Sequence, residues 1–214
     1  MKLLISALTK FILGVVLVGA LVFLPAGSLN FFGGWLFMAL LFIPVFILGV
    51  VLFIKSPSLL EKRLSSKEKE GTQKGVVGAS ALIFIIGFVL SGLDYRFGWT
   101  RLHISVSIAA SVGFLLSYLL YAEVMRENAY LSRTVEVQEN QTVVDTGLYG
   151  IVRHPMYSAT ILLFLSIPLV LGSVFSFAIF LVYPFIIAKR IKNEEELLEK
   201  EQQKFMEYLS DVLN

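Results

Sequence analysis

The chain is built around apolar segments of about 20 residues, each long enough to cross a lipid bilayer. A hydrocarbon core of ~30 Å needs about 20 apolar residues in one α-helix. Four segments meet this length, at residues 3–24, 35–54, 76–93 and 102–122. Because backbone N–H and C=O groups inside lipid must be paired, continuous apolar segments of this kind are helical. The sequence therefore predicts an all-α, polytopic membrane protein with four spanning helices.

The composition agrees with a membrane protein. Hydrophobic residues make up 57% of the 214 residues, charged residues make up only 16%, and the mean hydropathy is +0.79. These values lie outside the usual range of a soluble domain. Since no internal repeat or low-complexity tract interrupts the pattern, we expect a single integral membrane domain over residues 1–214.

A fifth apolar run, at residues 156–188, is too long for one ordinary crossing. Its 33 residues would extend about 50 Å as one helix. Near its middle stand Pro168, which lacks a backbone donor, and the Gly172-Ser173 pair, which favours a turn. We therefore predict a C-terminal membrane helical hairpin, followed by a cytosolic helix. Both ends of the hairpin then lie on the same side of the membrane.

The distribution of basic residues predicts the orientation. Cytoplasmic loops are enriched in Lys and Arg. With the hairpin and a cytoplasmic N-terminus, 16 of the 18 basic residues lie inside and only Arg96 and Arg101 lie outside. If residues 156–188 crossed once, the distribution would be 11 against 7. We therefore expect the N-terminus, the loops beside the hairpin and the C-terminus to be cytoplasmic.

The sequence also argues against several classes of site. It has no cysteine, which excludes a thiol nucleophile or a thiolate metal site. Its two histidines, His103 and His154, fall in segments expected on opposite sides of the membrane, so no metal site is expected. The net charge of +2 is small and spread out, so no nucleic-acid partner is expected.

Two polar clusters flank the predicted hairpin. The first is Arg153-His154-Pro155-Met156-Tyr157, and the second is Arg190-Ile191-Lys192-Asn193-Glu194-Glu195. Ionisable residues beside a membrane are costly and commonly functional. Because the hairpin returns the chain to its starting face, these two clusters are expected to form one site.

These clusters resemble the motifs of the isoprenylcysteine carboxyl methyltransferase family, its bacterial relatives and the similar phospholipid N-methyltransferases. The resemblance spans about half of the chain, with the motifs between about residues 121 and 208. Besides the two clusters, it includes Met125-Arg126-Glu127-Asn128 with Ser132, and Thr146-Gly147-Leu148-Tyr149. It implies an enzyme that uses S-adenosylmethionine as cofactor and methylates a lipid or lipidated small molecule. We expect the methylated group of the acceptor to be a carboxyl group.

The residue types suit the parts of this cofactor. Glu194 and Glu195 can accept hydrogen bonds from a ribose diol or an ammonium group, and Arg153 or Arg190 can hold a carboxylate and are the candidate catalytic residues. The remaining candidates for cofactor binding are Tyr149, His154, Pro155 and Tyr157, whose rings offer hydrogen bonds, stacking or a face for the sulfonium. Asn128 and Ser132 are the candidate substrate-binding residues.

Structural roles and other functions remain open. His154 can cap the hairpin, Tyr149 and Tyr157 can anchor it at the interface, and Arg190 with Glu194 can form an ordinary i,i+4 pair. Other functions compatible with the sequence are lipid amine N-methylation, a sterol-reductase-like activity that uses a nicotinamide cofactor, and non-catalytic lipid binding or transport. Membrane lipids are expected partners in every case.

Overall fold

The computed structural model describes residues 2–65, 71–100, 102–127 and 146–213. Within these ranges the regular structure is entirely helical, as predicted. The helices are α1 (Lys2–Ala26), α2 (Phe32–Lys55), α3 (Pro57–Ser65), α4 (Gly71–Phe97), α5 (Ile104–Glu127), the 3-10 turn η1 (Gly147–Gly150), α6 (Pro155–Val170), α7 (Val174–Phe180) and α8 (Tyr183–Leu213).

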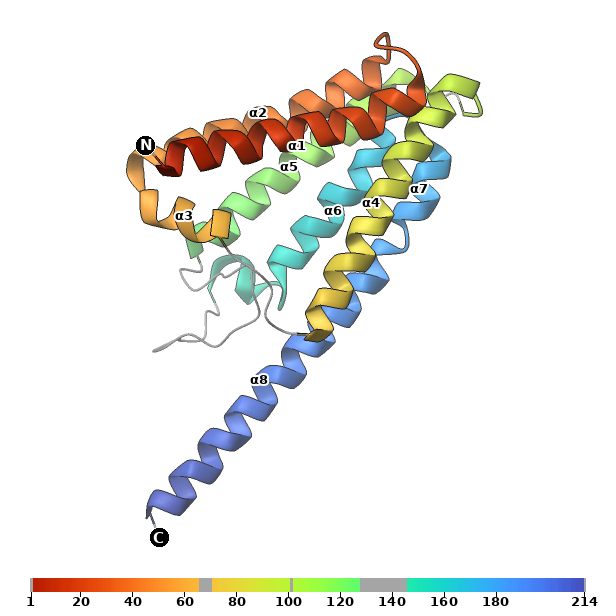
Figure 1. Ribbon diagram of the computed structural model, residues 1–214. Helices are drawn as coiled ribbons and strands as arrows, with labels where there is room; N and C mark the ends of the chain where they lie inside the picture. The colour runs from red at the N-terminus through yellow and green to blue at the C-terminus, as the bar shows by residue number, and fades with distance from the viewer. Residues whose placement is uncertain (1, 66–70, 101, 128–145, 214) are drawn as a thin grey trace.

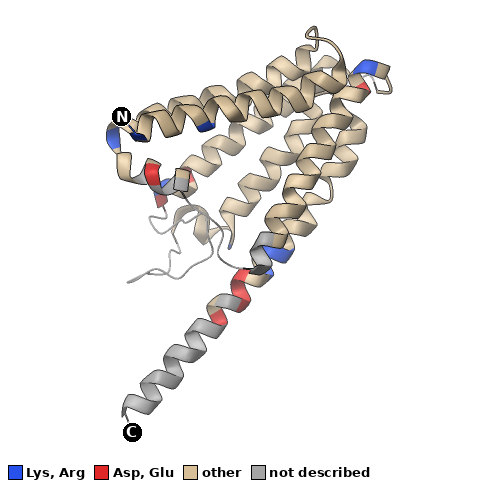
Figure 2. Cartoon of the chain, viewed as in Figure 1, with Lys and Arg blue, Asp and Glu red and all other residues tan. Residues whose placement is uncertain are grey.

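The four predicted spans are confirmed as long apolar helices. By length and composition, α1, α2, residues 75–97 of α4, and α5 can each cross a membrane, and so can residues 174–196. Large apolar side chains of α1 and α2 are exposed on the outside of the bundle, as expected for surfaces that face lipid. Within the bundle, most charged residues lie near the ends of the helices, whereas on α8 they lie along the part that extends beyond the bundle (Figure 2).

The predicted hairpin is also present. Its first arm is α6, and the chain turns at residues 171–173, where Gly172 has a φ of 79°. Ser173 caps the second arm, because its Oγ accepts a hydrogen bond of 3.1 Å from the Ser176 N–H. The second arm is interrupted at residues 181–182, and α8 then continues without a break to residue 213. The return through the membrane is thus formed by α7 and the first part of α8, and the rest of α8 extends beyond the bundle (Figure 1).

Aromatic side chains and glycines hold the helices together. The Phe84 and Phe88 rings of α4 lie 5.6 and 6.4 Å from the Phe180 ring of α7. A Cβ on Gly87 would overlap the Phe180 ring, and one on Gly92 would lie 2.6 Å from the Val22 carbonyl oxygen of α1. Small residues at these two positions therefore allow α4 to pack closely against α7 and α1.

A buried carboxylate binds the closed end of the hairpin, which is the turn between α6 and α7. Asp94 is 1% exposed and accepts hydrogen bonds from Thr100 N (2.7 Å), Thr100 Oγ1 (2.6 Å) and Ser173 Oγ (2.5 Å). The predicted span ends at residue 93, just before Asp94, but α4 continues to Phe97. The helix ends at Gly98, whose φ is 64° and whose N–H donates to the Asp94 carbonyl. Asp94 thus joins α4 to the turn of the hairpin.

Candidate functional site

His154 lies where the chain enters α6. It occupies the N-cap position, and its backbone carbonyl accepts hydrogen bonds of 3.1 Å from the N–H groups of Tyr157 and Ser158. Pro155 follows at the first helical position, where a missing N–H costs nothing. The imidazole takes no part in capping. Instead its Nε2 lies 3.1 Å from Oε1 of Glu195 on α8.

Tyr157 connects the same two helices one turn deeper. Its hydroxyl donates to Glu194 Oε2 over 2.7 Å and accepts from Arg190 Nε over 3.0 Å. Arg190 and Glu194 are one helical turn apart on α8, and both contact the same phenol oxygen. The expected convergence of the hairpin ends is therefore present. Three side chains, Tyr157 of α6 and Arg190 and Glu194 of α8, are joined in addition to the contact between His154 and Glu195.

A small apolar cluster fixes this arrangement from the membrane side. The rings of Tyr157 and Tyr183 and the side chain of Ile187 are buried, and Phe84 and Phe164 pack against them. Tyr157 is only 5% exposed. Because these contacts surround the Tyr157 ring, it has little rotational freedom. Its hydroxyl is therefore held in a fixed position for hydrogen bonds with α8.

The exposed side of the site belongs to His154 and Glu195. Their side chains are 28% and 48% exposed, whereas the Tyr157 contacts lie deeper. Solvent or a soluble ligand can therefore reach the imidazole and the outer carboxylate. An exposed pair of this kind contributes little to folding stability. A ligand can therefore replace the contact between His154 and Glu195 at little cost in stability.

The other predicted residues are placed less centrally or lie outside the described part of the chain. Arg153 is exposed on the approach to α6, and Tyr149 is half-buried in η1. Asn128 and Ser132, the candidate substrate-binding residues, lie outside the described residues. Their predicted role remains a prediction.

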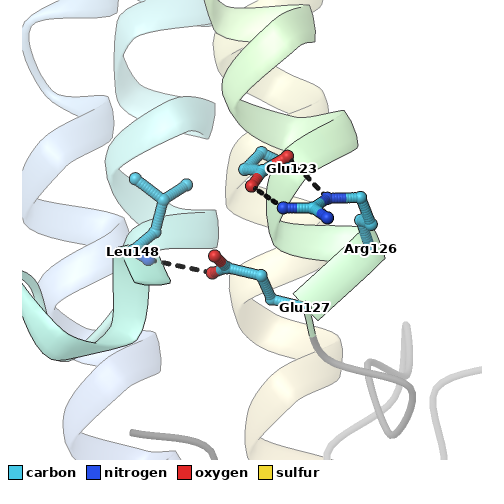
Figure 3. A network of polar contacts seen from close by, with 4 residues as sticks. All are labelled: Glu123, Arg126, Glu127 and Leu148. Carbon is cyan, nitrogen blue, oxygen red and sulfur yellow. Dashed lines mark hydrogen bonds and ion pairs between the residues drawn. The ribbon is translucent and has the colours of Figure 1, made fainter. Parts of the chain in front are cut away.

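Glu127 and Gly147 were quoted as motif residues but were not predicted to be part of the site. Glu127 Oε2 accepts a hydrogen bond of 2.9 Å from the Leu148 N–H (Figure 3). Gly147 has a φ of 54°, and a Cβ there would overlap the Glu127 carboxylate. Glu127 thereby joins the end of α5 to η1, just before α6. A carboxylate in the last turn of a helix is disfavoured by the helix dipole. The place of Glu127 at the end of an apolar segment was therefore the sequence signal that its carboxylate needs a hydrogen-bond donor.

The neighbouring charges on α5 are paired within that helix. Arg126 donates to Glu123 through Nε (2.9 Å) and Nη2 (2.5 Å), and neither side chain is joined to Leu148 (Figure 3). This pair is exposed and stabilises the end of α5 only weakly. Glu127 is therefore the acidic residue of this turn that contacts η1.

One donor in the site has no partner among the described residues. Asn193 Nδ2 is buried and unbonded there, one residue before Glu194. Buried donors in native proteins are normally satisfied, so Asn193 can donate to a ligand. In the described ranges, no group of three or more His, Cys, Asp or Glu side chains could hold a metal ion.

The comparison with protein families points to the same part of the chain. Residues 104–204 match the model of the phospholipid methyltransferase family. The matched segment runs from the start of α5 into α8 and contains every site residue described above. It does not single out the isoprenylcysteine carboxyl branch. No curated protein and no solved structure matches the chain.

Proposed function

We propose that this protein is an S-adenosylmethionine-dependent methyltransferase that acts on a lipid acceptor at the membrane surface. The proposal rests on a set of contacts at the open end of the hairpin, where α6 begins and α8 extends beyond the bundle. These contacts join His154, Tyr157, Arg190, Glu194 and Glu195. These contacts fall within the segment that matches a family of membrane methyltransferases.

The donor set fits this cofactor. S-adenosylmethionine supplies an electrophilic methyl group on a sulfonium, and it carries an ammonium, a carboxylate and a ribose diol for recognition. Glu195 is half-exposed and offers a carboxylate to the ammonium or the diol. Arg153 or Arg190 can orient the carboxylate, and His154 and Asn193 can add hydrogen bonds. Tyr157 holds Arg190 and Glu194 in position through its hydroxyl.

Methyl transfer asks the protein mainly for positioning. An in-line displacement needs the acceptor, the methyl group and the sulfur to be aligned and shielded from water. The site stands where apolar helix surfaces meet ionisable side chains, so an acceptor can keep its hydrocarbon part in the bilayer while its polar group reaches the site.

The first candidate acceptor is a carboxylate. A carboxylate is already a nucleophile at neutral pH and needs only desolvation and orientation. Arg153 is an exposed cation at the entrance to α6 and is placed to orient such a group. A methyl ester would be the product.

The second candidate acceptor is a lipid amine, such as one in the head group of a phospholipid, the lipid class that the description of the matched family names. An amine is mostly protonated near pH 7 and must lose a proton before attack. The His154 and Glu195 side chains, 3.1 Å apart and accessible, could receive that proton.

Methyl transfer from labelled S-adenosylmethionine into a membrane lipid extract tests the proposal. A carboxyl acceptor predicts a base-labile product whose single-turnover rate is nearly flat from about pH 6 to 8. An amine acceptor predicts a base-stable product whose rate rises over that range. Binding of NADPH in place of S-adenosylmethionine would favour a reductase, and binding of neither would favour a lipid-binding or transport protein.

The proposed orientation places the N-terminus, the site and the C-terminus in the cytoplasm. It is supported by the 16 to 2 distribution of basic residues. Since the chain has no native cysteine, single cysteines report sidedness without background. Those at Ser28 and Trp99 should label from outside the cell, whereas one at Gln203 should not. Outside labelling at Gln203 would contradict the cytoplasmic site.

A further inference from the structure

A cavity of about 550 Å³ lies between α1, α2 and α3. This volume is within the range of small-molecule sites, which is about 300 to 1,000 Å³. Apart from Lys10, the residues that line it are apolar or glycine, with Phe11, Phe42 and Phe46 among them. The cavity lies outside residues 104–204 and shares no residue with the methyl-transfer site.

The cavity opens toward the bilayer. Several residues that line it are also exposed on the outer surface of α1 and α2, including Leu8, Phe46 and Ile54. The Phe11 ring packs against Phe42 and Phe46 with centroid distances of 5.6 and 5.4 Å. An apolar cavity of this kind holds water poorly, so in a membrane hydrocarbon is the occupant that matches its walls.

Lys10 supplies the charged group of the cavity. Its Nζ donates a hydrogen bond of 2.5 Å to the carbonyl oxygen of Leu64, one of the last carbonyls of α3, which lack partners within the helix. A lysine ammonium has three donors. The bond to Leu64 uses one of them, and the remaining donors are available to an anion at the mouth of the cavity.

Other positive charges surround this end of α1 and α2. Lys2 begins α1 and Lys55 ends α2, and basic segments gather at this end of the two helices (Figure 2). Glu61 on α3 is acidic and follows Leu60, which lines the cavity. A positive mouth above an apolar cavity is complementary to an anionic head group attached to a hydrocarbon chain.

We propose that this cavity is a binding site for an anionic phospholipid. One acyl chain lies between α1 and α2, and the phosphate of the head group contacts Lys10. The site is separate from the methyl-transfer site and does not depend on the proposed enzymatic function. A bound lipid would also connect α3 to the first two spans, because Lys10 contacts both the lipid and Leu64.

The glycines of the chain provide a matched pair of variants. Gly49 lines the cavity, and a Cβ there meets no atom within 4 Å. The Cβ of Gly49→Leu therefore meets no neighbour, and the rest of the leucine side chain takes up space in the cavity. Gly78 on α4 also has no atom within 4 Å of an added Cβ but lies outside the cavity. Gly78→Leu adds the same side chain elsewhere and is the control.

The test is native mass spectrometry of the full chain from micelles that contain equal amounts of phosphatidylglycerol and phosphatidylcholine. We expect the wild type and Gly78→Leu to retain one phosphatidylglycerol, and Gly49→Leu to lose it. Lys10→Gln keeps an N–H donor for Leu64 and should reduce the preference for phosphatidylglycerol about five-fold.

Three results would overturn the proposal. The cavity is not the site if Gly49→Leu retains phosphatidylglycerol as the wild type does. The head group does not contact Lys10 if Lys10→Gln keeps the full preference. If added oleate is retained and phosphatidylglycerol is not, the ligand is a free fatty acid rather than a phospholipid.

Discussion

The two ends of the C-terminal hairpin use carboxylates in opposite ways. At the closed end, Asp94 is 1% exposed and accepts three hydrogen bonds from Thr100 and Ser173. At the open end, the side chain of Glu195 is 48% exposed and contacts His154. A carboxylate whose acceptor sites are filled by the protein stabilises the fold. One with accessible acceptor sites can bind a ligand.

The same contrast applies to the helices that the two ends join. The closed end fastens the hairpin turn to α4, where Gly87 and Gly92 allow close packing. The open end joins α6 to α8 through Tyr157, Arg190 and Glu194, and joins α5 to η1 through Glu127. A rigid closed end thus positions an accessible set of polar groups at the other end of α6.

The largest effect should come from removing the carboxylate of the closed end. Asp94→Ala leaves the buried donors of Thr100 and Ser173 unpaired, so the free energy of unfolding should fall by about 3 to 5 kcal/mol. Thermal unfolding in detergent measures this change. Thr100→Val removes one hydroxyl donor and should cost only about 1 kcal/mol. Equal stability of Asp94→Ala and the wild type would show that the closed end is not the structural one.

A smaller effect is expected for the buried tyrosine of the open end. Tyr157→Phe keeps the packed ring but removes the hydroxyl that contacts Arg190 and Glu194. Loss of hydrogen bonds to charged groups should lower cofactor affinity about ten-fold, with a decrease in stability of about 1 to 2 kcal/mol. Equilibrium binding and thermal unfolding measure the two effects separately. A loss of stability with unchanged affinity would make Tyr157 a purely structural residue.

Adding one methyl group at Gly147, where η1 contacts α5, should lower the stability of the protein. Gly147→Ala places a side chain at positive φ and against the Glu127 carboxylate, so we expect a loss of about 1 to 3 kcal/mol. Gly98→Ala is the matched control, because Gly98 also has a positive φ but no atom within 4 Å of an added Cβ. If both variants lose the same stability, the Glu127 contact contributes nothing beyond backbone strain.

Much of the fold could be predicted because the bilayer sets the length of its helices. The spans follow from the length of the apolar segments, and the turn of the hairpin follows from Gly172 and Ser173, whereas Pro168 lies within α6 and does not end it. The interruption at residues 181–182 was not predicted, although Pro184, which has no N–H for the carbonyl four residues earlier, follows it directly and explains it. The helical position of Asp94 was also missed, because the apolar span ends at residue 93 and the hydrogen-bond partners of Asp94 lie 6 and 79 residues away.

The site was predictable in its residues more than in its contacts. The sequence indicated that His154, Tyr157, Arg190, Glu194 and Glu195 would meet, since a hairpin joins its own ends. It could not indicate that Arg190 and Glu194 both contact the Tyr157 hydroxyl. That contact depends on how Tyr157, Tyr183 and Ile187 pack and so set the register between α6 and α8.

The central claim is that the open end of the hairpin binds S-adenosylmethionine, and calorimetric titration of the detergent-purified protein tests it most directly. Glu195→Gln and His154→Ala should each weaken binding about 10- to 100-fold, the effect of losing a hydrogen bond to a charged group. Glu199→Gln, on the exposed continuation of α8, should bind as the wild type does. Wild-type affinity in both Glu195→Gln and His154→Ala would contradict the account.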